Sequence, residues 1–288
     1  MKRILVVALA MLLLLTACSA GVSQAEYDAL VAENEQLKQQ LAQYEGSENV
    51  QTQNAPEAVE ESSSQEITLS EPIAVDASPA SESDFIYVNN GTEVQINGYK
   101  GNGGYIVMPS EIEGNPVTRI AQDAFRGADT ITGIVLPESL NYIGDSAFMY
   151  LSGLTGVLVI PETVTEIGQH AFFATSLTGI VIKGSCEIGP DSFRSILPLE
   201  FIYIEESCAP SINFRAFADN PALTKAILPE TMGEFKEDVF KGCNQLVICT
   251  PQSSSYVAGY ANSNFIAVDT DSYAEQAKHF SEMYPAGE

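Results

Sequence analysis

The residues best suited to chemistry in the C-terminal half of this chain are four cysteines: Cys186, Cys208, Cys243 and Cys249. Cys186 and Cys208 lie 22 residues apart, the same offset that separates Ile182 from Ile204 in two apolar runs. If those runs are neighbouring strands, about 4.8 Å apart, a disulfide between Cys186 and Cys208 is possible. Buried free thiols are the alternative, and for the other two cysteines they are the favoured interpretation.

Residue patterns for catalysis or metal binding are absent from the sequence. The two histidines, His170 and His279, have no Asp and nucleophile placed beside them, so both are expected to be solvated. Asp269 and Asp271 could meet calcium, but an acidic pair in a tail is usually solvated. No spacing of His and Cys fits a zinc site. The sequence therefore predicts no enzyme, no cofactor and no bound metal.

Phenylalanine recurs every 21 to 24 residues through the second half of the chain, at Phe125, Phe148, Phe172, Phe193, Phe217 and Phe240. A period of this length indicates a solenoid, in which each repeat buries its apolar face only against its neighbours. Such a stack offers a long surface for binding rather than a catalytic pocket. The predicted fold is a mainly β repeat solenoid.

Each repeat also contains a short apolar strand, whose alternate residues should face the core. The intervening residues then stack on the outer face as a candidate binding face: Val135, Val159, Val181, Phe201, Tyr203 and Ile227. Contiguous exposed apolar residues often mark interaction sites. Two alternatives remain open: these residues serve strand propensity alone, or a terminal segment covers them.

The repeats share a detailed pattern of strand, proline, Ile-Gly and Ala-Phe. It occurs at 134–137, 143–144 and 147–148, and again at 158–161, 167–168 and 171–172. This pattern resembles the BspA-type leucine-rich repeats of microbial surface proteins and covers about 84–268. The resemblance implies a curved stack of short strands and turns that is associated with adhesion or protein binding. Lys183-Gly184 and Glu205-Glu206 depart from it because both lack the proline.

The N-terminus predicts where the chain works. Lys2 and Arg3 precede an apolar run, 4–15, that is too short to span a membrane and is typical of a signal peptide. Leu15-Thr16-Ala17-Cys18 resembles the lipobox of bacterial lipoproteins. This implies a signal peptide at 1–17, a lipidated N-terminus at 18–24 and a lipid anchor on Cys18. The expected location is an extracytoplasmic cell surface; an ordinary secretory signal is the alternative.

Two further segments precede the repeats. Residues 25–45 carry inner positions at steps of three and four, which predicts a coiled-coil helix that could pair copies of the chain, or a monomeric helical spacer. Residues 46–83 are rich in Gln, Glu, Ser and Pro and are predicted to be a disordered acidic linker. The formal net charge of −25 makes nucleic acid an unsuitable partner.

Both ends of the repeat domain carry signals of their own. Strand-like runs at 85–88 and 94–96 flank Asn90-Gly91, which predicts a β-hairpin cap with a tight turn. In the tail, 269–288, Ser272 and Glu275 have capping-box spacing before a helical face. That helix is expected either to dock on the last coil or to fray.

Three functions from different classes follow. The favoured one is a surface-anchored, non-catalytic module that binds an unknown extracellular protein, or a glycan through Tyr203 and Phe201. The second is a structural envelope protein that self-associates through residues 25–45. The third, an enzyme, lacks candidate residues.

Overall fold

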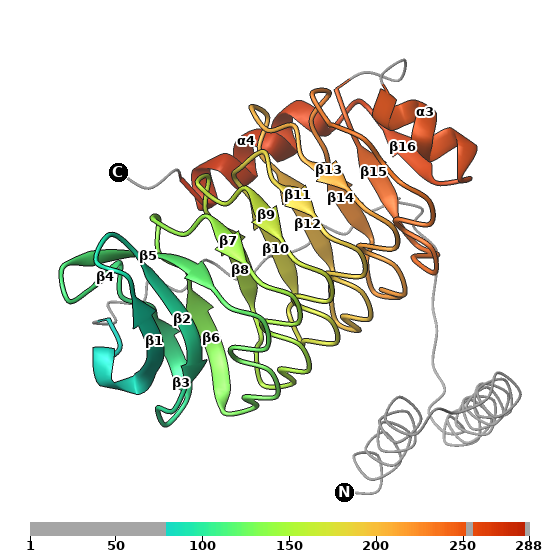
Figure 1. Ribbon diagram of the computed structural model, residues 1–288. Coiled ribbons are helices and arrows are strands. Elements are labelled where there is room, and N and C mark those ends of the chain that lie inside the picture. Colours follow the sequence, from blue (N-terminus) through green and yellow to red (C-terminus); the bar gives the residue numbers. More distant parts are fainter. Residues whose placement is uncertain (1–78, 252–255, 286–288) are drawn as a thin grey trace, which may run out of the picture. The chain divides into compact units, whose positions relative to one another are not determined.

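The computed structural model describes residues 79–251 and 256–285. The predicted signal peptide, lipidated N-terminus and coiled-coil helix, and the linker up to residue 78, lie outside the described residues. Within these ranges the chain forms the predicted mainly β solenoid, wound from short strands and turns (Figure 1). No helix among the described residues is long and apolar enough to cross a membrane.

The solenoid begins with a short helical turn and a β-hairpin. The 3₁₀ helix η1 (Glu82–Asp84) leads into β1 (Phe85–Asn89), which pairs antiparallel with β2 (Val94–Tyr99). The connection is a wider loop than the predicted tight turn. The side chain of Asn90 holds it by accepting hydrogen bonds from the backbone N–H groups of Thr92 and Glu93, both at 2.9 Å. Asn side chains favour turns for this reason.

Two long sheets form opposite walls of the stack. One has eight strands in the order β1-β2-β5-β7-β9-β11-β13, with β4 beside β5. Its remaining members are β4 (Glu111–Ile112), β5 (Asn115–Ile120), β7 (Tyr142–Ile143), β9 (Glu166–Ile167), β11 (Glu187–Ile188) and β13 (Ser211–Ile212). From β2 to β13, consecutive strands of this order run parallel, as a solenoid requires.

The second sheet has six parallel strands in the order β16-β15-β14-β12-β10-β8. They are β8 (Val157–Ile160), β10 (Gly179–Ile182), β12 (Phe201–Ile204), β14 (Lys225–Ile227), β15 (Val247–Cys249) and β16 (Ala267–Asp269). A separate parallel pair, β3 (Gly104–Val107) and β6 (Ile131–Val135), lies at its N-terminal side. We call the surface of β3, β6 and these six strands that points away from the core the outer face.

The recurring phenylalanines form the spine of the core. Neighbouring rings stack with centroids 4.9 Å apart for Phe125 and Phe148, and 5.1 Å apart for Phe172 and Phe193. The first five are at most 1% exposed, and Phe240, at the C-terminal end of the series, is 5% exposed. Because each ring lies between the rings of the adjacent coils, the period of the sequence is the period of the stack.

Each phenylalanine turn bends through two residues in the left-handed backbone region. Ser146 and Tyr150, with φ of 55° and 64°, flank Phe148 two residues away on either side, and the other five turns have the same pair of positive φ values. The Ile-Gly step follows from the close approach of coils. A Cβ atom on Gly168 would lie 2.6 Å from the backbone nitrogen of Asp145, so a larger residue does not fit.

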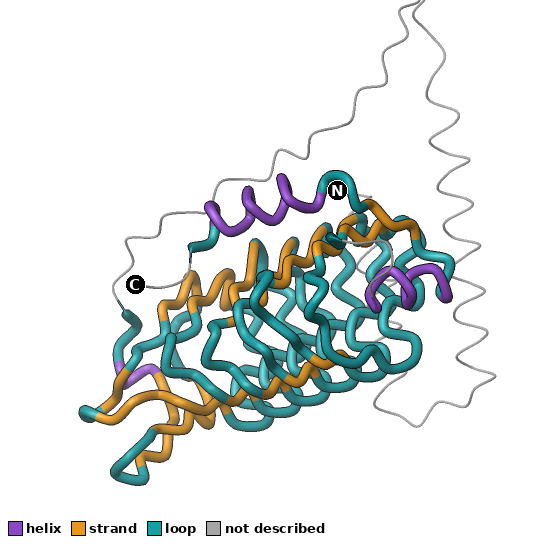
Figure 2. Tube along the Cα trace, turned by 90° about the horizontal axis from the view of Figure 1, so that it is seen from above, coloured by secondary structure: helices purple, strands orange, loops and turns teal. Residues whose placement is uncertain are grey.

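Two helices follow the last repeats. α3 (Tyr256–Ser263) lies at the C-terminal end of the stack, and α4 (Tyr273–Met283) lies along one row of strands (Figure 2).

Candidate functional site

The strongest candidate site is the outer face, because its side chains stack in register from strand to strand. In the parallel pairing, Val159 lies beside Val181, Val181 beside Tyr203, and Tyr203 beside Ile227. A second row joins Gly179 to Phe201. The alternation read from the sequence thus identifies the side chains that point away from the Phe core.

Helix α4 covers much of this face, which corrects the expectation that all six residues are exposed. Val181, Phe201, Tyr203 and Ile227 are at most 2% exposed. They form an apolar cluster, separate from the Phe core, with these residues of α4 and β15: Cys249, Tyr273, Ala277 and Phe280. The ring centroid of Phe280 lies 4.9 Å from that of Phe201 and 5.2 Å from that of Tyr203. The covering segment left open as an alternative is therefore the C-terminal tail.

The length of α4 explains which strands it covers. Eleven residues at 1.5 Å per residue make a helix about 16 Å long. Strands β10, β12, β14 and β15 are three spacings apart in total, or about 14 Å. The helix is therefore long enough to cross these four strands and too short to reach β6 and β3.

The start of α4 is organised by an aspartate rather than by the predicted capping box. Ser272 makes no side-chain cap hydrogen bond. It donates its hydroxyl to Asp269 Oδ2 at 2.5 Å, and Asp269 Oδ1 accepts the backbone N–H of Asp271 at 3.0 Å. The Ser272 hydrogen bond is the main reason that the pKa of Asp269 is lowered. Beyond the other end, Lys183 Nζ donates to the carbonyl oxygen of Pro285.

The interface under α4 is dry enough to change the acidity of its tyrosines. Burial raises the pKa of Tyr203 and of Tyr273 to about 12, with smaller contributions from the charge of Glu206. The Tyr273 hydroxyl is buried without a hydrogen-bond partner. Both phenols therefore stay neutral at physiological pH, and this part of the face offers no base.

The N-terminal part of the outer face is left uncovered. Val135 is 40% exposed and Tyr105 is 44% exposed, while Val157 and Val159 are half-buried beside the cluster under α4. Tyr105 belongs to a strand that precedes the regular repeats, and sequence reasoning missed it. Gly133 could have signalled it, since a Cβ atom there would collide with the Tyr105 ring. We call Tyr105, Val135, Val157 and Val159 the free strip.

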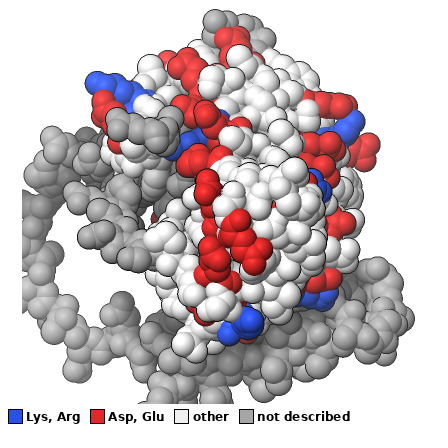
Figure 3. Space-filling view, turned by 60° about the vertical axis from the view of Figure 1, so that its left-hand side comes forward, with Lys and Arg blue, Asp and Glu red and all other residues white. Residues whose placement is uncertain are grey.

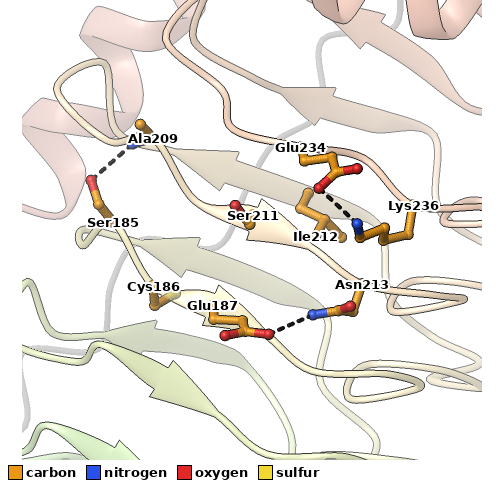
Figure 4. Close-up of a pocket in the computed structure, with 9 residues that line it drawn as sticks. All are labelled: Ser185, Cys186, Glu187, Ala209, Ser211, Ile212, Asn213, Glu234 and Lys236. Atoms are coloured by element: carbon orange, nitrogen blue, oxygen red, sulfur yellow. Dashed lines mark hydrogen bonds and ion pairs between the residues drawn. The ribbon is translucent and has the colours of Figure 1, made fainter.

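The opposite wall has a polar hollow of about 330 Å³ near its C-terminal end (Figure 4). Ser211 occupies the outward position that Glu187 holds on the neighbouring strand, and this small side chain leaves space. The groups around the hollow already pair with one another. Asn213 Nδ2 donates to Glu187 at 3.0 Å, and Lys236 forms an ion pair with Glu234 at 2.7 Å. These pairs leave no charged group aimed into the space.

The described cysteines are all free thiols, so the predicted Cys186–Cys208 disulfide is not formed. The assumed register does not persist between the strands. Ile182 pairs with Ile204, 22 residues later, whereas Glu187 pairs with Ser211, 24 residues later. Two extra residues therefore lie in the later coil near Cys208. Cys243 and Cys249 are buried free thiols, as favoured, and Cys243 donates to the Phe217 carbonyl at 3.2 Å.

The histidines do not build a catalytic group. His170 Nε2 lies 3.8 Å from Asp191, at the edge of a phenylalanine turn, and its ring packs edge-on against Phe173. His279 lies on the exposed side of α4. In residues 79–251 and 256–285, no three His, Cys, Asp or Glu side chains are grouped so that they could hold a metal ion. The face seen in Figure 3 carries a column of acidic side chains with fewer basic ones.

Comparisons with known proteins agree with this architecture. A family model described as the BspA type leucine rich repeat region matches residues 118–247 in 6 copies. No curated protein matches the chain. A solved leucine-rich repeat protein of T. pallidum is 30% identical, with a TM-score of 0.55, over 59% of this chain and 81% of that chain.

Two further solved structures are similar at lower identity. A leucine-rich repeat protein of Bacteroides ovatus is 19% identical, with a TM-score of 0.40, over 59% of this chain and 55% of that chain. A leucine rich cell surface protein of Faecalibacterium prausnitzii is 17% identical, with a TM-score of 0.21, over 70% of this chain and 98% of that chain.

Proposed function

Because the chain belongs to the family of BspA-type leucine-rich repeat proteins, we propose that it is a non-catalytic binding module. It is held at a bacterial cell surface by a lipid on Cys18 and contacts an extracellular protein. The predicted linker, 46–83, gives the repeat domain reach from the membrane. This assignment of location follows from the lipobox resemblance of residues 15–18.

The observation that carries the proposal is the free strip. Its four side chains are apolar and come from three successive strands, and α4 covers the neighbouring strands. A face that the protein needed only for stability would be covered along its whole length. Leaving Val135 and Tyr105 in water loses the free energy of burying them, about 25 cal/mol per Å² of apolar surface. Contiguous exposure of this kind is typical of a protein interaction site.

The glycan alternative loses its basis in the structure. Tyr203 and Phe201, the aromatic residues considered for a sugar platform, are each 2% exposed beneath α4. The envelope-protein alternative depends on residues 25–45, which lie outside the described residues.

The test is capture of surface proteins by the full chain and by a variant carrying Val135→Asp and Val159→Asp. The matched control is Val88→Asp, at an apolar residue of β1 that is 55% exposed on another wall. We expect a saturable partner that is retained by the control and lost by the double variant, with the melting temperature of all three proteins similar. Identical partners for all three would contradict the proposal.

A further inference from the structure

The C-terminal end of the solenoid carries a phenylalanine that the fold does not use. Phe265 follows α3 and is 98% exposed, the highest value among the exposed large apolar residues of the described chain. Most exposed apolar residues need no explanation, but this one also has an unfavourable backbone. Its φ is +58°.

The local geometry shows that this position suits a different residue type. The Ile266 N–H donates to the carbonyl of Ala261 at 2.9 Å, and the Phe265 N–H donates to that of Asn262 at 3.3 Å. These two hydrogen bonds form a Schellman motif that ends α3, and Phe265 is its left-handed residue. Glycine and asparagine are the usual residues there, because a bulky side chain is strained at positive φ. The phenyl ring is therefore not required to end the helix.

A hollow of about 390 Å³ lies directly beside Phe265. Its apolar lining comes from Phe240, Leu246, Tyr260 and Ile266. The ring of Phe265 does not fill this hollow, since nearly all of the side chain is in solvent. One end of the molecule thus presents an apolar projection and an apolar recess next to each other.

We propose that this end of the solenoid is a self-association surface, in which Phe265 of each copy inserts into the hollow beside Phe265 of a second copy. A two-fold interface brings the same patch of both copies together. A projection beside a recess is self-complementary under such a rotation, because each ring meets the other copy's recess. A different partner would use the recess or the ring, but would have no need of both.

Charge and strand edges agree with a second copy as the partner. The charged residues lining the hollow are Asp238 and Lys241, which pair with each other at 3.0 Å. This balance matters because the chain is acidic and like charges would otherwise meet at the interface. β16 is the last strand of its sheet among the described residues, so the proposed interface also lies at an unpaired strand edge.

The decisive variant is Phe265→Asn in the full chain, measured by sedimentation equilibrium in detergent over a wide range of concentration. Asn suits the left-handed position, so the melting temperature should stay equal or rise. Removing two central aromatic rings per dimer should weaken dimerisation roughly 100-fold or more. The matched control is Leu197→Asn, at an apolar turn residue that is 49% exposed elsewhere, and it should leave dimerisation unchanged.

A second experiment locates the contact. A photoreactive benzophenone amino acid at position 265 keeps an aromatic ring there, and a mixture of ¹⁵N-labelled and unlabelled copies distinguishes links between copies from links within one. Cross-links from position 265 to residues 240–246 of the other isotope support the proposal. Cross-links within one isotope alone overturn it.

Two further outcomes would also overturn it. One is a chain that stays monomeric at all concentrations. The other is a dimer that survives Phe265→Asn but is lost on Leu37→Pro, which would assign self-association to residues 25–45. The free-strip variant with Val135→Asp and Val159→Asp should dimerise normally, so the two proposals fail independently.

Discussion

At the scale of single residues, one buried asparagine joins three coils of the stack. Asn220 is fully buried. Its Oδ1 accepts the Ile196 N–H at 2.7 Å, and its Nδ2 donates to the carbonyls of Phe193 and Phe217 at 3.0 and 2.8 Å. Such a side chain supplies hydrogen bonds that no strand provides at the turns.

Asn220→Ala should therefore lower the free energy of unfolding by about 3 kcal/mol, because it leaves one buried donor and two acceptors unsatisfied. Urea denaturation of the full chain measures this. Asn213→Ala, which removes a more exposed hydrogen bond to Glu187, is the control and should cost less than about 0.5 kcal/mol. Equal costs for both variants would contradict the role given to Asn220.

Asp269 predicts a dependence on pH. Its folded-state pKa lies below the ordinary value of 3.8, mainly because the Ser272 hydroxyl donates to the carboxylate. The stabilisation is present above the unfolded pKa and is lost as the pH falls through the folded pKa. The difference in unfolding free energy between the native chain and Asp269→Asn should be constant from about pH 7 to pH 5 and shrink below about pH 4. Urea titrations at several pH values measure it; a difference independent of pH would be evidence against it.

The buried thiols make a third prediction. Burial raises the pKa of Cys186 to about 12, so almost no thiolate exists at pH 8 and iodoacetamide should not react with the folded protein. Ser207→Cys, at an exposed position, should react quickly as a control. After unfolding without reductant, both Cys186 and Cys208 should alkylate, as followed by mass spectrometry. Their failure to do so would restore the disulfide.

At the scale of elements, the sequence predicted the strands and their two faces better than it predicted what lies on them. The alternation in Ile180, Val181 and Ile182 identifies which side chains point outward, because that depends on local geometry. It does not tell that Val181 is covered, since the cover comes from α4, about a hundred residues later. The apolar side of that helix, Phe280 included, was visible in the sequence, but its docking position depends on contacts between distant elements.

The docking of α4 can be tested by Phe280→Ala. This removes the ring that packs on Phe201 and Tyr203, so the amides of α4 should exchange hydrogen at least about tenfold faster while those of β7 to β13 keep their protection. Lys278→Ala, whose partner Glu282 is also exposed, should leave exchange unchanged. Hydrogen exchange with mass spectrometry distinguishes these cases. Unchanged exchange in Phe280→Ala would mean that α4 is held by something other than this ring.

At the scale of the whole molecule, the phenylalanine period was sufficient to predict the stack. Each ring contacts the ring of the next coil, so the repeat is visible in sequence and in space alike. The two extra residues between Ile204 and Ser211 could not be placed in the same way. They change the offset between neighbouring coils from 22 to 24 residues, and a period alone does not tell where a coil accepts an insertion.

Phe172→Ala should cost about 4 kcal/mol, because it empties a fully buried site between two stacked rings. Since coils contact only their neighbours, the halves on either side should also lose cooperativity, and the urea m-value should fall. Phe214→Ala, at a residue that is 39% exposed, is the control and should cost less than about 1 kcal/mol. A cost as small for Phe172→Ala would contradict the spine.

The fixed length of α4 makes the free strip a quantity that changes in whole steps. Each added coil widens the sheet by one strand spacing, about 4.8 Å, while an 11-residue helix always covers about 16 Å. A relative with one more coil would therefore gain one more uncovered strand, and a relative with three fewer would have none. In this chain, the tail measures the sheet from its C-terminal end, and the number of coils beyond that measure sets the size of the partner it can accept.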